Sequence, residues 1–163
     1  MRNAVFAGTF DPITKGHEAV IEKASKMFDN LTVAICINPD KKALFSVKDR
    51  LEMLTAVCSE YKNVEVLYYE GMLVDLMKEK GAIYNVRGIR NSKDFEYENE
   101  MHYYNSSLYS DLVTVYLPCD KNLTEISSTM ARKSVIDKNY DTALLSQKVI
   151  DIIKRIDSKD NKL

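Results

Sequence analysis

The sequence predicts a single doubly wound α/β domain of the Rossmann-like kind, with a five-stranded parallel sheet and helices on both faces. Short apolar, β-branched runs alternate along the chain with longer stretches whose apolar residues recur at helical spacing. Strands that are separated by helices form a parallel sheet covered on both faces. The 163 residues suit one domain, and no repeat, linker or low-complexity segment divides them.

Five short runs are expected to form the strands. They are residues 4–7, 31–37, 64–69, 82–86 and 112–117. Pro39 lies just beyond the second run, and Pro118 closes the fifth. Because proline cannot donate to the hydrogen bonding of a sheet, both positions are consistent with strand ends.

Helical periodicity predicts a helix after each strand. The first opens near Gly16 and His17, the second follows Ser46, and later ones cover 72–80, cover 94–109, begin at Ser127 and include Val149 to Ile156. Ser46 is a typical N-cap with Asp49 as its capping-box partner, and Gly81 can adopt the positive φ of a helix end. The charged residues 157–163 are expected to fray, so the domain is expected to span residues 1–156.

Composition argues against several classes of protein. A formal net charge of −1 at pH 7 disfavours a surface that captures nucleic acid. The first strand follows Met1 directly, without a charged leader or a long apolar run, so we expect neither a secretory signal nor a membrane span. Cys36, Cys58 and Cys119 form no CxxC pair, which is typical of reduced thiols in a cytoplasmic protein. With only 2 histidines, a protein-held metal such as structural zinc is not expected.

Polar and basic segments follow the ends of four expected strands. They are residues 9–17, 40–42, 87–90 and 124–129. In an open parallel sheet, ligands bind outside the carboxyl ends of the strands, where these segments are expected to meet. Together they supply an imidazole, lysines, arginines and hydroxyls. Such a set suits a polyphosphate, because guanidinium groups bind phosphate oxygens in pairs and ammonium groups add positive charge.

His17 is the most informative residue of this edge. It belongs to the first turn of a helix, where unpaired N–H groups and the positive end of the helix dipole attract an anion. The sequence suggests neither a Ser-His-Asp nor a Cys-His arrangement, and it contains no GxxxxGK[ST] loop. Phosphoryl and nucleotidyl transfer need positioning and charge stabilisation rather than a protein nucleophile, so this equipment is suitable for them.

Several motifs resemble those of a known family. Gly8-Thr9-Phe10-Asp11-Pro12 and Thr14-Lys15-Gly16-His17 are similar to the TxGH signature of the nucleotidyltransferase superfamily. The blocks that resemble, more narrowly, the bacterial phosphopantetheine adenylyltransferase family are Pro39-Asp40-Lys41-Lys42, Gly71-Met72-Leu73-Val74-Asp75, Arg87-Gly88-Ile89-Arg90, Asp94-Phe95-Glu96-Tyr97-Glu98 and Ile126-Ser127-Ser128-Thr129. The resemblance covers residues 1–156, which it identifies as a nucleotidyltransferase domain.

The resemblance implies an enzyme that transfers the adenylyl group of ATP reversibly to 4′-phosphopantetheine. The products are 3′-dephospho-coenzyme A and pyrophosphate, in the penultimate step of coenzyme A biosynthesis. The implied mechanism is direct in-line attack without a covalent enzyme intermediate. The resemblance further implies Mg²⁺ held mainly by the ATP phosphates, and a cytoplasmic homohexamer with neither nucleic acid nor a membrane as partner.

Residue roles are implied by position. His17 is implied to stabilise the transition state at the α-phosphate, and Lys41 and Arg90 are the other implied catalytic residues. The residues implied to bind ATP are Thr9, Phe10, His17, Gly88, Ile89, Arg90, Glu98, Leu123, Thr124, Glu125, Ile126, Ser127, Ser128 and Thr129. Those implied to bind phosphopantetheine are Thr9, Lys41, Leu73 and Arg87. The chain departs from the family at Leu123 and Glu125, where members usually carry aromatic residues.

Two alternatives remain at this stage. The chain could be another member of the superfamily that acts on nicotinamide mononucleotide, flavin mononucleotide or glycerol phosphate. Lys41 and the blocks Arg87-Gly88-Ile89-Arg90 and Asp94-Phe95-Glu96-Tyr97-Glu98 favour phosphopantetheine instead. It could also be a nucleotide-binding sensor without catalysis, because one fold supports many functions. The retained His17, Lys41 and Arg90 favour an enzyme.

Overall fold

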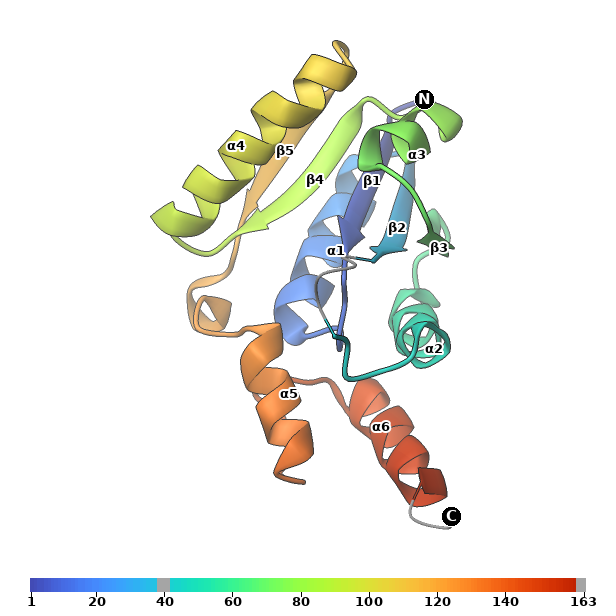
Figure 1. Ribbon diagram of the computed structural model, residues 1–163, viewed down its shortest axis with the longest axis vertical. Helices are drawn as coiled ribbons and strands as arrows, with labels where there is room; N and C mark the ends of the chain where they lie inside the picture. The colour runs from blue at the N-terminus through green and yellow to red at the C-terminus, as the bar shows by residue number, and fades with distance from the viewer. Residues whose placement is uncertain (38–41, 161–163) are drawn as a thin grey trace.

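A five-stranded, all-parallel sheet forms the centre of the molecule in the computed structural model, which describes residues 1–37 and 42–160. The strands are β1 (Asn3–Gly8), β2 (Asn30–Cys36), β3 (Val64–Tyr69), β4 (Tyr84–Ile89) and β5 (Val113–Pro118). Their order in the sheet is β3-β2-β1-β4-β5 (Figure 1). The chain therefore winds outward in both directions from β1. The predicted fold class is confirmed, and the switch between β1 and β4 is the position where ligands bind in such sheets.

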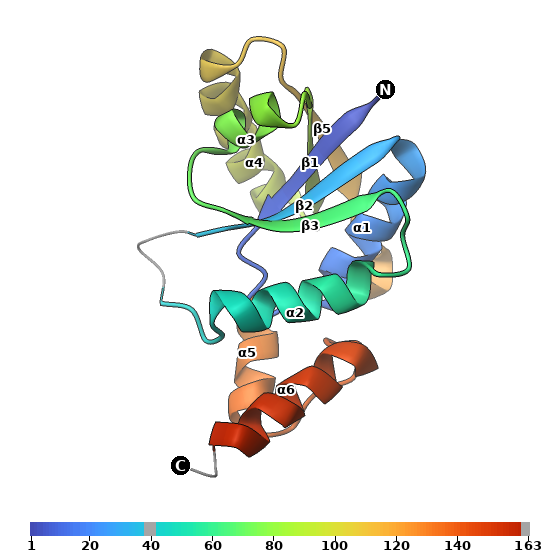
Figure 2. The same cartoon turned by 90° about the vertical axis from the view of Figure 1, so that its right-hand side faces the viewer.

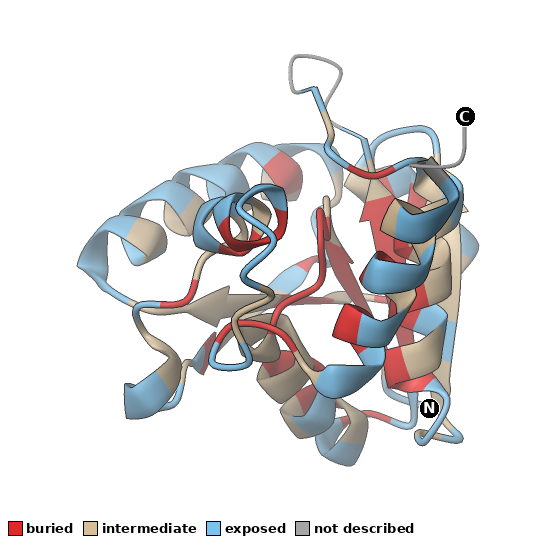
Figure 3. Ribbon diagram, turned by 90° about the horizontal axis from the view of Figure 1, so that it is seen from below, coloured by how far each residue is buried: buried red, intermediate tan, exposed pale blue. Residues whose placement is uncertain are grey.

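Six helices surround the sheet in the described part of the chain. They are α1 (Lys15–Met27), α2 (Val47–Cys58), α3 (Leu73–Glu79), α4 (Ser92–Leu108), α5 (Ser128–Ile136) and α6 (Gln147–Asp160), with a short 3-10 turn at Lys121–Leu123. One buried cluster joins α1, α2, α5 and α6 below one face, and a smaller cluster lies between the other face and α3 (Figure 2). Helix α4 lies against β4 on the side of α3 and buries only Asn105 fully, so most of its surface is exposed or half-buried (Figure 3).

The helix ends follow the predicted capping. The Ser46 hydroxyl accepts a hydrogen bond from the Asp49 N–H at 3.1 Å, and the Ser127 hydroxyl accepts one from the Met130 N–H at 3.2 Å. Gly81 follows α3 with a φ of 57°. Ser46 as an N-cap, the helix start at Ser127 and the positive φ of Gly81 are therefore confirmed. Asp49 does not complete the predicted capping box, because its carboxylate accepts a hydrogen bond from the Ser46 hydroxyl at 2.6 Å instead of from the Ser46 backbone N–H. Within the described residues, no helix is both long and apolar enough to cross a membrane.

Strand β4 ends later than the sequence predicted, and this is a correction that matters for the site. The expected strand stopped at residue 86, whereas β4 continues through Arg87 and Gly88 to Ile89. Pairing with β5 extends over the whole of β4, while pairing with β1 is limited to Tyr84 and Asn85. The neighbouring strand β5 therefore keeps the backbone extended past the glycine, and Arg87 projects from inside the strand rather than from a loop.

Helix α6 also ends later than expected. It continues to Asp160, so residues 157–160, which were expected to fray, are helical. Asp157 accounts for part of this order, since its carboxylate accepts a hydrogen bond from the Tyr140 hydroxyl at 2.6 Å and pairs with Lys138 at 2.7 Å. The same contacts keep the pKa of Asp157 below its usual value.

Candidate active site

A cavity of about 600 Å³ opens at the carboxyl ends of β1 and β4. This volume lies in the range of small-molecule sites. The sequence-predicted residues that line it are Thr9, Phe10, His17, Arg87, Gly88, Arg90, Glu98, Ile126, Ser127, Ser128 and Thr129. Leu73, Ile89, Leu123, Thr124 and Glu125 are not among its lining residues. Lys41 lies outside the described residues, and its neighbour Lys42 lines the cavity.

His17 is held in place by the start of its own helix. Thr14 is the N-cap of α1, and its hydroxyl accepts a hydrogen bond from the His17 N–H at 3.5 Å. In return, Nδ1 of His17 accepts a hydrogen bond from the Thr14 N–H at 3.1 Å. The imidazole thus occupies the place that glutamate or glutamine takes in an ordinary capping box. Phe10 packs against the ring edge to face, with 5.1 Å between the ring centroids.

The surroundings of His17 determine its charge. Burial, and after it the positive charges of Arg87 and Arg90, together lower the pKa of the imidazole from 6.5 to about 4. The ring is therefore neutral near pH 7. Because Nδ1 accepts the hydrogen bond from Thr14, the single ring proton belongs on Nε2. His17 is consequently a neutral hydrogen-bond donor through Nε2.

The turn before α1 takes its shape from buried polar contacts. The Asp11 carboxylate, 3% exposed, accepts hydrogen bonds from the N–H groups of Leu44 at 2.8 Å and Phe45 at 2.9 Å. Arg50 of α2 is buried as well and donates to the Thr9 carbonyl at 3.0 Å. These contacts fix the backbone that leads to His17. Sequence reasoning missed them, because the partners lie 33 or more residues apart and no local pattern connects them.

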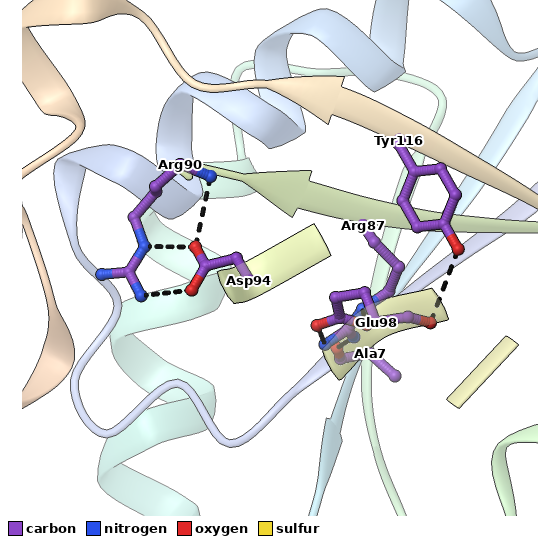
Figure 4. A network of polar contacts seen from close by, with 6 residues as sticks. All are labelled: Ala7, Arg87, Arg90, Asp94, Glu98 and Tyr116. Atoms are coloured by element: carbon purple, nitrogen blue, oxygen red, sulfur yellow. Dashed lines mark hydrogen bonds and ion pairs between the residues drawn. The ribbon is translucent and has the colours of Figure 1, made fainter. Parts of the chain in front are cut away.

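Arg87 fills the gap where β1 and β4 separate. Its Nε and Nη2 donate to the two carboxylate oxygens of Glu98 at 2.7 and 2.5 Å, and its Nη1 donates to the Ala7 carbonyl at 2.6 Å (Figure 4). Glu98 lies on α4, so the arginine links that helix to the end of β1. This paired, two-bond geometry is among the stronger ionic contacts in proteins.

Arg90, which directly follows β4, makes a similar link to Asp94, one turn before Glu98 on α4. Its Nε and Nη2 donate to Asp94 at 2.8 and 3.1 Å (Figure 4), and its Nη1 donates to the Ile126 carbonyl at 2.9 Å. The hydrogen bonds from Arg90 lower the pKa of Asp94, and Asp94 raises the pKa of Arg90. Arg90 therefore connects the first turn of α4 to the segment that precedes α5.

Arg132 is a cavity residue that sequence reasoning missed. It lies on α5, one turn after Thr129, and donates to the Thr129 hydroxyl at 3.1 Å and to the Asp11 carbonyl at 3.0 Å. The helical spacing from Thr129 was a usable signal, because residues three apart share one helix face. Arg132 therefore adds a further positive charge to the wall of the cavity.

The assembled cavity suits an anionic ligand with more than one phosphate group. Lys42, Arg87, Arg90 and Arg132 line it, and the N-terminal turns of α1 and α5 face it. Neutral His17 adds a hydrogen-bond donor between them. Among the described residues, no group of three or more potential metal ligands occurs. The arrangement can bind polyphosphate and stabilise negative charge that develops on it.

Comparison with protein families gives a match over most of the chain. The model of the cytidylyltransferase-like family matches residues 5–134. A curated relative from Clostridium novyi (strain NT), named phosphopantetheine adenylyltransferase, is 40% identical over 157 residues, which is 96% of this chain and 98% of the relative. A relative of the same name from Clostridium botulinum (strain Hall / ATCC 3502 / NCTC 13319 / Type A) is 40% identical over 160 residues, with 98% of each chain covered.

Solved structures share the fold at lower sequence identity. The nicotinic acid mononucleotide adenylyltransferase of Plasmodium falciparum, complexed with NaAD, superimposes with a TM-score of 0.67 and 20% identity, covering 98% of each chain. The same enzyme complexed with APC gives a TM-score of 0.66 and 18% identity. These similarities support the fold.

Proposed function

The chain belongs to the cytidylyltransferase-like family, and on that basis we propose that it transfers the adenylyl group of ATP to 4′-phosphopantetheine. The products are 3′-dephospho-coenzyme A and pyrophosphate, in coenzyme A biosynthesis. The observation that carries this assignment is the 40% identity to curated phosphopantetheine adenylyltransferases over nearly the whole of both chains. The cavity agrees with it, since positive side chains from several strand ends surround one space.

His17 is proposed to stabilise the transition state at the α-phosphate. The phosphate of the acceptor attacks the α-phosphorus in line, pyrophosphate departs, and no bond forms to the protein. Negative charge grows on the oxygens of the phosphorus under attack, and a preoriented neutral donor lowers the energy of that state. The Nε2–H of His17 is such a donor, because the Thr14 N–H engages the opposite ring nitrogen. The positive charges of Arg90 and Lys41 are proposed to assist.

The residues proposed to bind ATP come from the turn after β1, the end of β4, helix α4 and the segment that leads into α5. They are Thr9, Phe10, His17, Gly88, Ile89, Arg90, Glu98, Leu123, Thr124, Glu125, Ile126, Ser127, Ser128 and Thr129. Phe10 is 2% exposed, so it offers its backbone rather than its ring. Thr9, Lys41, Leu73 and Arg87 are proposed to bind phosphopantetheine.

Mg²⁺ is proposed to arrive with ATP. The nearby carboxylates are poor ligands for a resident ion, since Asp11 accepts two backbone N–H bonds, and Asp94 and Glu98 are paired with arginines. The ATP phosphates would therefore supply most of the oxygen ligands, as is common for this ion, and the bound metal would neutralise their charge.

Pyrophosphate release tests the proposed function. The purified chain is incubated with ATP, Mg²⁺ and 4′-phosphopantetheine, and pyrophosphate and dephospho-coenzyme A are measured. Parallel reactions contain nicotinamide mononucleotide, flavin mononucleotide or glycerol phosphate. Release that depends on 4′-phosphopantetheine supports the assignment. Release with another acceptor would reassign the substrate, and tight ATP binding without release from any acceptor would indicate a sensor.

A homohexamer in the cytoplasm is proposed for the assembled enzyme. Tyr97, Met101, Tyr104 and Leu108 are exposed and recur at helical spacing along α4, which makes an apolar stripe that a second copy can cover. The three cysteines, all free, are consistent with a reducing compartment. Light scattering at several protein concentrations measures the oligomeric state, and a monomer at all of them would contradict the hexamer.

A further inference from the structure

Glu98 occupies one of the two edges at which the Arg87 guanidinium can bind a phosphate with two hydrogen bonds. The Nε and Nη2 of the guanidinium form two parallel hydrogen bonds to the Glu98 carboxylate, at 2.7 and 2.5 Å (Figure 4). The third nitrogen, Nη1, donates to the Ala7 carbonyl at 2.6 Å. Each of the three nitrogens therefore has one partner in the ligand-free protein, and three of the five N–H groups are used. A phosphate cannot make a two-bond contact with the Nε–Nη2 edge while Glu98 remains there.

We propose that the Glu98 carboxylate holds the place of the acceptor phosphate on Arg87 and leaves when that phosphate binds. This inference rests on the proposed function, in which Arg87 binds the phosphate of phosphopantetheine. It makes Glu98 a residue that sets the affinity for the acceptor. Toward the acceptor, Glu98 acts through Arg87, so in this respect it is a positioning residue, separate from its proposed contact with ATP.

Electrostatics explains why a place-holder is useful at this position. The side chains of Arg87 and Glu98 are only 25% and 13% exposed, so an arginine without a counterion would remain charged and poorly solvated in the cavity wall. Carboxylate and phosphate both fit the planar fork of a guanidinium. Exchange of one anion for the other therefore keeps the arginine paired and oriented throughout the binding step.

The contacts of Glu98 differ from those of Asp94, the other carboxylate of α4 that pairs with an arginine. Asp94 also accepts a hydrogen bond from the Arg90 backbone N–H at 3.2 Å, so it is held locally even if the guanidinium moves. Among the described residues, the carboxylate oxygens of Glu98 bond only to Arg87. Loss of that one partner frees the Glu98 carboxylate, and both residues already line the cavity.

In the wild-type chain, the acceptor phosphate must displace Glu98 from Arg87, and this lowers the affinity for the acceptor by a measurable amount. Glu98→Gln keeps the size of the side chain but removes its charge, so phosphate meets a weaker competitor for Arg87. We expect the Kd for 4′-phosphopantetheine, measured without ATP, to decrease about five- to tenfold, the size of a partly exposed ion pair. The gain should shrink at high ionic strength, because salt screens such a pair.

Titration calorimetry of the intact chain tests this inference. The variants are Glu98→Gln and Glu98→Asp, whose shorter side chain cannot keep both hydrogen bonds. Glu96→Gln is the matched control, since Glu96 is an exposed residue of the same helix that does not line the cavity. Pantetheine, which lacks the phosphate, is the control ligand. Thermal unfolding establishes that each variant is folded.

Tighter binding of 4′-phosphopantetheine to both Glu98 variants, with no gain for Glu96→Gln or for pantetheine, supports the inference. If Glu98 is instead a permanent clamp that orients Arg87, both variants bind the phosphate equally well or more weakly, and the inference is overturned. Failure of the proposed function is separate, since it appears as absent pyrophosphate release by the wild-type chain. In that case titration with inorganic phosphate still decides whether Glu98 competes for Arg87.

Discussion

The backbone N–H of Thr14 donates to Nδ1 of His17 at 3.1 Å, and this contact determines which nitrogen of the imidazole carries the proton. Thr14 is the N-cap of α1, so the capping of the helix and the tautomer of the candidate catalytic residue depend on the same turn. Burial and the charges of the two nearby arginines lower the pKa of the ring and keep it neutral, and Phe10 packs against it edge to face. The first turn of α1 therefore holds the His17 imidazole as a preorganised hydrogen-bond donor through Nε2.

His17 should remain neutral, with its proton on Nε2, well below the pH at which histidine usually titrates. Burial and the charges of Arg87 and Arg90 lower its pKa from 6.5 to about 4. Nitrogen-15 NMR of the labelled chain distinguishes the two tautomers and follows the titration. The chain has only 2 histidines, so His102→Gln assigns the signals. A His17 signal that titrates near pH 6.5 would contradict the assigned charge.

The same shift makes a prediction about stability. Between pH 6.5 and about 4 the unfolded chain takes up a proton at His17 that the folded chain does not. The free energy of unfolding should therefore fall as the pH drops through this window. Above pH 6.5 His17 is neutral in both the folded and the unfolded chain, so its titration costs no stability there. Urea unfolding of wild type and His17→Ala at several pH values isolates the contribution. Parallel pH curves for the two proteins would show that His17 titrates normally.

Removal of the imidazole should affect the chemical step more than ATP binding. In His17→Ala the donor to the α-phosphate is lost, and kcat should fall by about 10²- to 10³-fold, as for the loss of a preorganised oxyanion donor. The Kd for ATP should change much less, because the interaction strengthens in the transition state. Steady-state kinetics and ATP titration measure the two quantities. Nearly normal turnover would remove His17 from the mechanism.

Sequence patterns predicted the layers of the fold and most of the cavity wall, and local physics explains this success. Strand β3 was predicted with its observed ends because a β-branched, apolar run is a local signal. A helix was also predicted to begin at Ser127, which is the N-cap of α5, a position that serine favours. Ser127 lines the cavity, as was expected of a segment that follows a strand end.

What the sequence could not predict depends on contacts between distant segments. The extension of β4 through Arg87 required knowledge of its pairing with β5. The pairing of Arg87 with Glu98 links a strand to a helix, and Asp11 bonds to residues 33 and 34 positions away. Arg132 reaches 121 residues back to the Asp11 carbonyl. Each of these contacts exists only after the sheet has formed.

Asp94→Asn should impair ATP binding selectively. Asp94 receives two hydrogen bonds from the guanidinium of Arg90, whose remaining anchor is the Ile126 carbonyl. A neutral amide holds the arginine less firmly, so the KM for ATP should rise about five- to tenfold. The KM for phosphopantetheine should change less than the KM for ATP. Initial rates with each substrate varied in turn give both values, with Glu96→Gln as control, and equal increases in the two constants would argue against a specific role.

Gly88 allows α1 to approach β4. A methyl group at this position should displace α1 and thereby shift His17, which lies at the start of that helix. A Cβ on Gly88 would lie 2.7 Å from Cγ2 of Val20, a buried residue one turn after His17. Val20 is β-branched and in a helix, so it has little freedom to move aside. Gly88→Ala should therefore push α1 outward, reduce the free energy of unfolding by about 1–3 kcal/mol and lower kcat.

The double variant Gly88→Ala/Val20→Ala tests the cause, because removal of the Val20 methyl groups makes room for the new one. Urea unfolding and kcat are measured for both single variants and the double variant. If the contact with Val20 is responsible, the double variant should be more stable and more active than the sum of the single effects predicts. Strict additivity would mean that the alanine acts through the ligand site directly, since Gly88 also lines the cavity.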